Sequence, residues 1–201
     1  MKQTLRLAAL AVAVFAALPL AAHEVEYRAI LTGPSESPPN GSLGMGEAEL
    51  EIDLDTAMMR VYLDFSGLSG TTTIAHVHCC TAVPGQGTSI PATITPSFPN
   101  FPTGVTSGSY DMTFDLSLAS SYNPAFITAN GGTVSGALNA FLAGLEGGSA
   151  YFNIHTTEFP TGEIRGFLAP VTAPVPEPET YALMLGGLAA LGAVARRRKL
   201  H

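Results

Sequence analysis

Apolar and polar residues alternate along several short segments of this chain. The alternation is regular over residues 24–32, 46–54 and 58–65, and acidic residues occupy the polar side of the second segment. Successive side chains of a β-strand point to opposite faces, so each segment is a predicted strand with one face against a core. In the first two segments the predicted inward residues are Val25, Tyr27, Ala29, Leu31, Ala48, Leu50, Ile52 and Leu54.

The same pattern returns at residues 74–78, 108–118, 151–155 and 163–168. A short turn at residues 55–56 joins two of the earlier strands into a hairpin. In total the pattern indicates about seven strands, mostly antiparallel. It predicts a mostly β fold, either an antiparallel β-sandwich or a flattened Greek-key-like barrel.

Helical spacing replaces the alternation in part of the second half. Asn123 followed by Pro124 is typical of a helix start, and Thr133 is a candidate cap for a second helix that ends at Gly147. The predicted apolar face of that second helix is Val134, Leu138, Phe141, Leu142 and Leu145. One or two short inserted helices are therefore expected. Residues 81–106 have no period, and their length predicts a functional loop or a flap that shields a ligand.

The first 22 residues are typical of a secretory signal peptide. Lys2 and Arg6 accompany an apolar run at residues 7–20, and Ala21 and Ala22 provide small residues for cleavage. We expect removal of residues 1–22, which leaves one domain over residues 23–172.

Residues 173–201 have a three-part pattern. Pro176, Glu177 and Pro178 precede an apolar segment at 180–195, and a basic cluster follows at 196–199. We expect residues 180–195 to form a transmembrane helix in the precursor, with the basic cluster on the cytoplasmic side. The pattern resembles the PEP-CTERM sorting signal of Gram-negative bacteria. That resemblance implies recognition by an exosortase and a final location at the cell surface or outside the cell, often beside exopolysaccharide.

Domain 23–172 is strongly acidic. Its three basic residues, Arg28, Arg60 and Arg165, and its fourteen acidic residues give it a formal charge of −11. Because nucleic acids and anionic lipid surfaces attract basic proteins, this charge argues against both as partners. Glu163 and Arg165 fall on one face of the last predicted strand, where they would form an ion pair or orient a histidine.

Three histidines fall in strand-like segments that are far apart in the chain. His76 and His78 share one face of the strand at 74–78, and His155 lies on the polar, outward side of the strand at 151–155. Two imidazoles two residues apart on a strand can chelate one ion, and imidazole suits copper and zinc. The metal hypothesis predicts that the three side chains converge. The alternative is that His76 and His78 are structural and hydrogen-bond to the loop at residues 159–163.

The two cysteines, Cys79 and Cys80, are adjacent. An exported protein meets an oxidising compartment, where thiols tend to pair. Four states remain open on the sequence alone: a vicinal disulfide, an intermolecular bridge, soft metal ligands beside the histidines, and unpaired thiols.

Several separated segments of domain 23–172 combine into a family pattern. They are residues 27–33, Glu36 with Pro38 and Pro39, Gly67 with Leu68, residues 75–78 and residues 151–166. The pattern resembles the CHRD domain, which is named for its repeats in chordin, and the resemblance covers nearly the whole domain. It implies an extracellular module and no particular catalytic activity. Cys79, Cys80 and the long segment after them depart from the family pattern.

The order of the histidines also resembles copper/zinc superoxide dismutase, a Greek-key barrel with a His-x-His strand and a later copper histidine. The domain has one further histidine, His23, so the bridging histidine and the zinc ligands of that enzyme have no counterparts. No serine–histidine–aspartate order or nucleophile elbow is present. We therefore expect a non-enzymatic surface or extracellular-matrix module, with a mononuclear copper or zinc domain built on His76, His78 and His155 as the alternative.

Overall fold

The computed structural model describes residues 23–171, 185–188, 191 and 196. The predicted signal peptide at 1–22 and the motif Pro176, Glu177 and Pro178 lie outside these residues, as does most of the predicted transmembrane segment 180–195. Among the residues that are described, no helix combines the length and the apolar character needed to cross a membrane.

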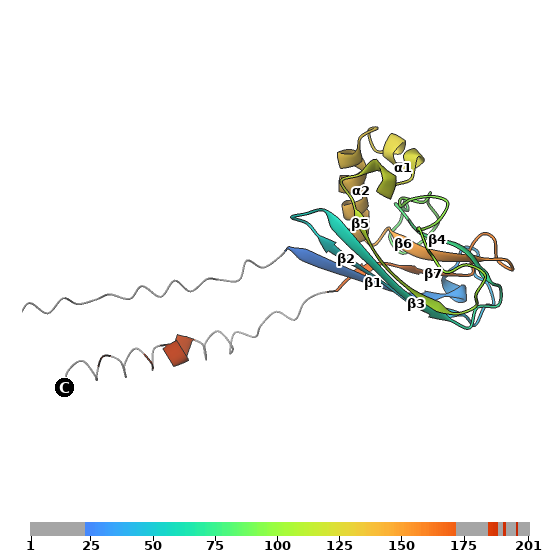
Figure 1. Cartoon of the computed structure of the whole chain (residues 1–201), viewed down its shortest axis with the longest axis horizontal. Helices are drawn as coiled ribbons and strands as arrows, with labels where there is room; N and C mark the ends of the chain where they lie inside the picture. The colour runs from blue at the N-terminus through green and yellow to red at the C-terminus, as the bar shows by residue number, and fades with distance from the viewer. Residues whose placement is uncertain (1–22, 172–184, 189–190, 192–195, 197–201) are drawn as a thin grey trace, which may run out of the picture.

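The described residues form a mostly antiparallel β domain, as the alternation predicts (Figure 1). The strands pair in the order β4-β6-β7-β1-β2-β3-β5, with β8 beside β1. Their bounds are β1 Glu24–Thr32, β2 Met45–Asp53, β3 Met58–Ser66, β4 Thr72–His78, β5 Gly108–Asp115, β6 Tyr151–Thr156, β7 Ile164–Phe167 and β8 Ala169–Pro170.

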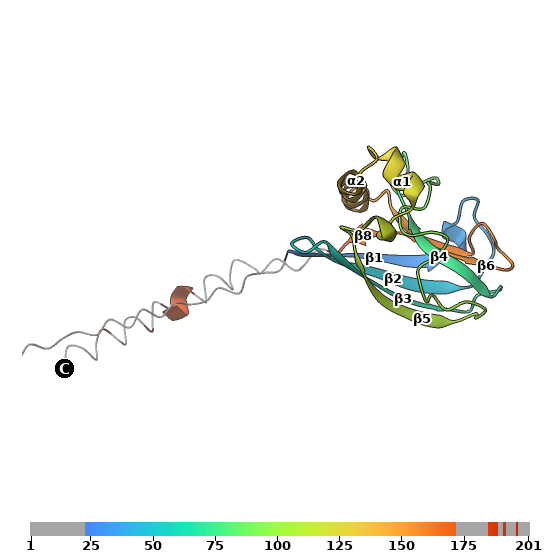
Figure 2. The ribbon, with the colours of Figure 1, turned by 45° about the horizontal axis from the view of Figure 1, so that its top comes forward.

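The strands form one curled sheet, a half-barrel, and not the predicted sandwich or flattened Greek-key-like barrel (Figure 2). In the described part of the chain, the edge strands β4 and β5 do not pair with each other. Alternation indicates which face a residue occupies, but it does not indicate which strand lies beside it. The hairpin of β6 and β7 lies between β4 and β1, and this placement brings the two histidine-bearing strands side by side.

The apolar side of the sheet forms the core. Most of the predicted inward residues of β1 and β2 are at most 4 % exposed, for example Leu31, Ala48 and Leu50. Val25 near the start of β1 is only partly buried. Leu54 is 46 % exposed, because β2 ends at Asp53 and Leu54 lies in the turn beyond it. On the other face of the hairpin, Arg60 bridges Glu51 and Asp111 at the surface.

Both predicted helices are present, and both start at the predicted caps. The side chain of Asn123 accepts from the amide of Ala125 at the start of α1, and that of Thr133 accepts from Gly136 at the start of α2. The helices are α1 Pro124–Ala129 and α2 Val134–Glu146, with single 3₁₀ turns η1 Gly33–Ser35 and η2 Ala119–Ser121. Figures 1 and 2 show α1 and α2 together on one side of the sheet.

The long segment between β4 and β5 packs into the open side of the curled sheet. The ring of Phe98, which is 2 % exposed, lies 5.2 Å from that of Phe114 in β5 and 5.7 Å from that of Phe152 in β6. One loop residue therefore links strands from the two ends of the sheet. The loop is part of the core, and it also covers the histidines of β4.

Replacing Phe98 with leucine is expected to lower the free energy of unfolding by about 1–2 kcal/mol, because three ring contacts are lost with little change in volume. Urea unfolding of the purified chain measures this. Val83→Ala in the same loop is the control, since Val83 is 52 % exposed and should change stability by less than about 0.5 kcal/mol. If Phe98→Leu lowered the free energy of unfolding as little as Val83→Ala does, the loop would not belong to the core.

Candidate metal centre

Strand pairing brings the three candidate histidines together. β4 and β6 are antiparallel neighbours, with His76 opposite Asn153 and Ile74 opposite His155. His76 and His155 are therefore diagonal neighbours on one face of the sheet. Each of the three imidazoles, those of His76, His78 and His155, offers one nitrogen, and these nitrogens all lie within 4.8 Å of one another.

The face that carries the histidines is buried, whereas the sequence pattern predicted a polar, outward face. His76 is 4 % exposed, and His78 and His155 are each 8 % exposed. The cause is the loop between β4 and β5 together with the turn after β6, which fold over this face. Alternation distinguishes the two faces of a strand, but it does not reveal a loop that covers the second one.

Each of the three imidazoles uses its Nδ1 atom to bind a backbone carbonyl. The pairs are His76 with Pro96 at 3.0 Å, His78 with Ser89 at 2.7 Å, and His155 with Pro160 at 2.9 Å. A carbonyl oxygen only accepts, so each Nδ1 carries the hydrogen and each Nε2 of a neutral ring has a free lone pair. The structural alternative placed the partners of His76 and His78 in the loop at 159–163, but only His155 binds there.

The Nε2 atoms of His76 and His155 lie close together, and in the described part of the chain no group other than these rings hydrogen-bonds to any of the three Nε2 atoms. Those of His76 and His155 are 3.1 Å apart, and that of His78 is buried with no hydrogen-bond partner among the described residues. Burial lowers the pKa of His76 to about 4 and that of His78 to about 3, and it also lowers the pKa of His155. At neutral pH three uncharged rings therefore aim their lone pairs into one buried space.

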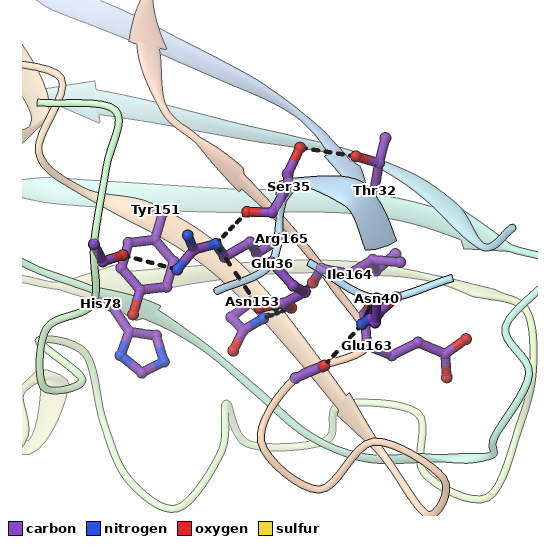
Figure 3. Close-up of polar contacts among 12 residues, drawn as sticks. Thr32, Ser35, Glu36, Asn40, His78, Tyr151, Asn153, Glu163, Ile164 and Arg165 are labelled. Carbon is purple, nitrogen blue, oxygen red and sulfur yellow. Dashed lines mark hydrogen bonds and ion pairs between the residues drawn. The ribbon is translucent and has the colours of Figure 1, made fainter. Parts of the chain in front are cut away.

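A stack of side chains fixes the ring of His78 (Figure 3). The ring of Tyr151 lies parallel to that of His78, with 4.6 Å between centroids, and the guanidinium of Arg165 lies 4.8 Å from the Tyr151 centroid. Arg165 itself donates to the carbonyls of Ser35 and Gly87. Tyr151 and Arg165 thus form a second row of side chains behind the histidines, and this row holds the ring of His78 in place.

Glu36 joins this network from a loop that is 117 positions before its partner Asn153. Its Oε1 accepts from Nδ2 of Asn153 at 2.6 Å, and its Oε2 lies 3.8 Å from Nε of Arg165. Burial raises the pKa of Glu36, although both partners oppose that rise. Neither Glu36 nor Tyr151 was predicted as a site residue, since no local spacing links them to the histidines.

Glu163 does not pair with Arg165, so the expected ion pair between them was wrong. Glu163 precedes β7, is fully buried and accepts hydrogen bonds from four groups. The donors are the hydroxyls of Ser42 and Thr156 and the backbone amides of Ser69 and Gly70. Burial raises the pKa of Glu163, but these hydrogen bonds outweigh it, and the pKa ends below its ordinary value. Glu163 thus joins loops and does not orient a histidine.

Cys79 and Cys80, which directly follow β4, form a vicinal disulfide. Cys79 is 1 % exposed, and the two sulfur atoms lie against Gly144 of α2, where a side chain would have no room. As a disulfide the pair has no thiolate to offer the site. Of the four states that the sequence left open, the structure shows this one.

A half-barrel with a loop-covered cluster of three histidines is thus the class of domain that the structure defines. The family model of the CHRD domain matches residues 27–168, and the chain belongs to that family. No curated protein and no solved structure was found to match the chain.

The PEP-CTERM protein-sorting motif matches residues 174–199, in agreement with the pattern of the C-terminal segment. The motif implies export in a Gram-negative bacterium, a membrane-anchored precursor and recognition by an exosortase-type sorting enzyme. The CHRD domain is thereby the part of an exported, sorted surface module that carries the histidine cluster.

Proposed function

We propose that this chain is a non-enzymatic surface module whose CHRD domain binds one copper or zinc ion through Nε2 of His76, His78 and His155. The observation that carries the proposal is the commitment of all three Nδ1 atoms to backbone carbonyls. That commitment leaves the Nε2 lone pairs free and facing one another. Metal-binding histidines commonly have this second hydrogen bond, because it fixes the tautomer and the ring orientation.

The distances suit a single ion. Metal–imidazole bonds of about 2.0–2.1 Å separate tetrahedral nitrogen ligands by about 3.3–3.4 Å. The Nε2 atoms of His76 and His155 are 3.1 Å apart, and all three nitrogens fall within 4.8 Å. Small rotations of the rings therefore suffice for all three to reach one ion, and Irving–Williams preferences favour copper and zinc among divalent ions.

A proton shared between His76 and His155 is the competing explanation for their short contact. It requires one ring to be charged, and burial lowers the pKa of both rings below the ordinary imidazole value. It also leaves Nε2 of His78 without a partner. A metal ion accounts for all three nitrogens at once, and the proton accounts for two.

The surroundings favour binding over turnover. In the described part of the chain, the groups around the histidines are backbone carbonyls and the side chains of Tyr151, Asn153 and Arg165. These groups do not include a nucleophile paired with a general base. The ligands are nearly fully buried, so a bulky substrate has no route to the ion. We propose that the surface or matrix role, with exopolysaccharide or other surface proteins as partners, belongs to the outside of the domain, and that the ion stabilises the module.

Calorimetric titration of the full chain in detergent with zinc(II) and copper(II) tests the proposal. We expect one ion per chain, with binding lost in His155→Ala. His23→Ala is the control, since the side chain of His23 is 75 % exposed and lies outside the site. Absence of binding in the parent chain, or unchanged binding in His155→Ala, would overturn the proposal.

A further inference from the structure

We infer that the histidine site selects copper(I), a monovalent ion, over zinc(II) and copper(II). The inference rests on the proposed metal site and concerns the charge of the ion that it accepts. The site consists of three uncharged ligands in a buried space whose nearest ionised groups cancel each other. Such an environment discriminates between ions by charge.

The ligand set supplies no negative charge. Within the part of the chain that the structure describes, the donor atoms that converge here are the nitrogens of His76, His78 and His155, with no carboxylate or thiolate among them. Each ring is neutral, because its single hydrogen lies on Nδ1 and faces a carbonyl. The disulfide of Cys79 and Cys80 removes the thiolates that stand closest in sequence. The ligands therefore do not neutralise the charge of a bound ion.

The second row of side chains does not supply the missing charge. The only ionised groups that the structure places in the stack and its hydrogen-bond network are Arg165 and Glu36, whose closest described approach is 3.8 Å. Arg165 is 4 % exposed and its positive charge acts on the ring of His78, where it disfavours a further cation. Glu36 offsets Arg165 and hydrogen-bonds Asn153, so the pair leaves no net anion for the ion.

Charge then decides the selectivity. The cost of moving an ion from water into a low-dielectric site grows with the square of its charge, so a divalent ion costs roughly four times as much as a monovalent ion of similar size. A divalent ion can offset that cost by binding an anionic ligand, which would have to come from solvent or from the protein. Nε2 of His78 is inaccessible to solvent, and the cluster of donor atoms in the described residues contains no anionic group. Copper(I) satisfies the site without one.

Zinc(II) is the matched comparison for copper(I). Both ions have a filled d shell and neither imposes a geometry through its d electrons, so their main difference in this site is charge. Comparing copper(II) with copper(I) tests the same idea, because the two ions are the same element with different charges. The ratio of its affinity to that of copper(I) fixes the shift of the reduction potential by 59 mV for each tenfold difference.

The experiment is competition of the full chain in detergent against chromophoric chelators, for copper(I) without oxygen and for zinc(II) and copper(II) separately. We expect copper(I) to bind at least about a hundredfold more tightly than copper(II) and zinc(II). That preference raises the reduction potential of the bound copper by about 118 mV relative to the aqueous couple, at 59 mV per tenfold. Direct voltammetry measures the same potential independently.

His155→Glu tests the charge argument within the same site, and His155→Gln is its neutral, equally long control. The glutamate variant is expected to bind zinc(II) more tightly than copper(I), whereas the glutamine variant weakens both ions without reversing their order. Zinc(II) or copper(II) binding as tight as copper(I) in the parent chain would overturn this inference and leave the metal site standing. No binding of any of the three ions would overturn the metal site itself.

Discussion

Saturation with metal is expected to raise the free energy of unfolding of the domain by about 4 kcal/mol when free metal is a thousandfold above its dissociation constant. In the proposed site the ion is held by three histidines that only the fold brings together, so binding would draw the equilibrium toward the folded state. In His76→Ala the increase should fall below about 1 kcal/mol, since His76 is one of the two rings in the 3.1 Å contact. Urea unfolding with and without metal measures both values.

His23→Ala should retain the full metal-dependent increase. Its side chain is exposed and contacts Asp55, and it is not part of the cluster of three histidines. Without metal, His76→Ala should lower the free energy of unfolding by only about 1–2 kcal/mol. The variant loses one hydrogen bond to Pro96, but it also removes the unfavourable contact between the lone pairs of His76 and His155. If His76→Ala kept the metal-dependent increase, the ion would have to bind elsewhere.

Replacing Glu163 with alanine is expected to lower the free energy of unfolding by about 3–5 kcal/mol, the largest loss that we predict for one residue outside the metal site. Glu163 is fully buried and accepts from Ser42, Thr156 and two backbone amides. Alanine leaves all four donors without an acceptor. Chemical unfolding at pH 7 measures the loss, and Glu158→Ala, an exposed glutamate five positions earlier, should change stability by less than about 0.5 kcal/mol.

The contribution of Glu163 should depend on pH with a definite sign. Its pKa in the folded protein is below the ordinary value of 4.5, so the folded state favours the ionised form. The stabilisation is complete above pH 4.5 and is lost as the pH falls through the lower, folded-state pKa. The difference between the parent chain and Glu163→Gln should therefore shrink from pH 7 to pH 3. A constant difference across that range would contradict the role of the carboxylate.

The sequence predicted the strands, both helix caps and the set of three histidines because each rests on a local pattern. Alternation predicted that Leu31, Ala48 and Leu50 face the core, and all three are fully buried. The caps at Asn123 and Thr133 follow from residue type alone. The resemblance to the CHRD family is confirmed over residues 27–168, and it was visible in the sequence because the family motifs are spread along the domain.

The arrangement of the strands and the second row of the site depend on long-range contacts, which local patterns do not encode. A sandwich and a curled sheet share the same alternation, and they differ in which strands pair. Glu36 meets Asn153 across 117 positions, and Arg165 pairs with Glu36 and not with the nearby Glu163. His155 was predicted on the outward face of its strand, but that face of β6 is buried because loops with no periodicity fold over it.

The most direct test is a crystal structure of the full chain loaded with copper or zinc, with anomalous scattering recorded at the absorption edge of the metal. We expect one anomalous peak about 2.0–2.1 Å from Nε2 of each of His76, His78 and His155, with their Nδ1 atoms still bound to carbonyls. A peak elsewhere, or a metal-free site in which His76 and His155 share a proton, would contradict it.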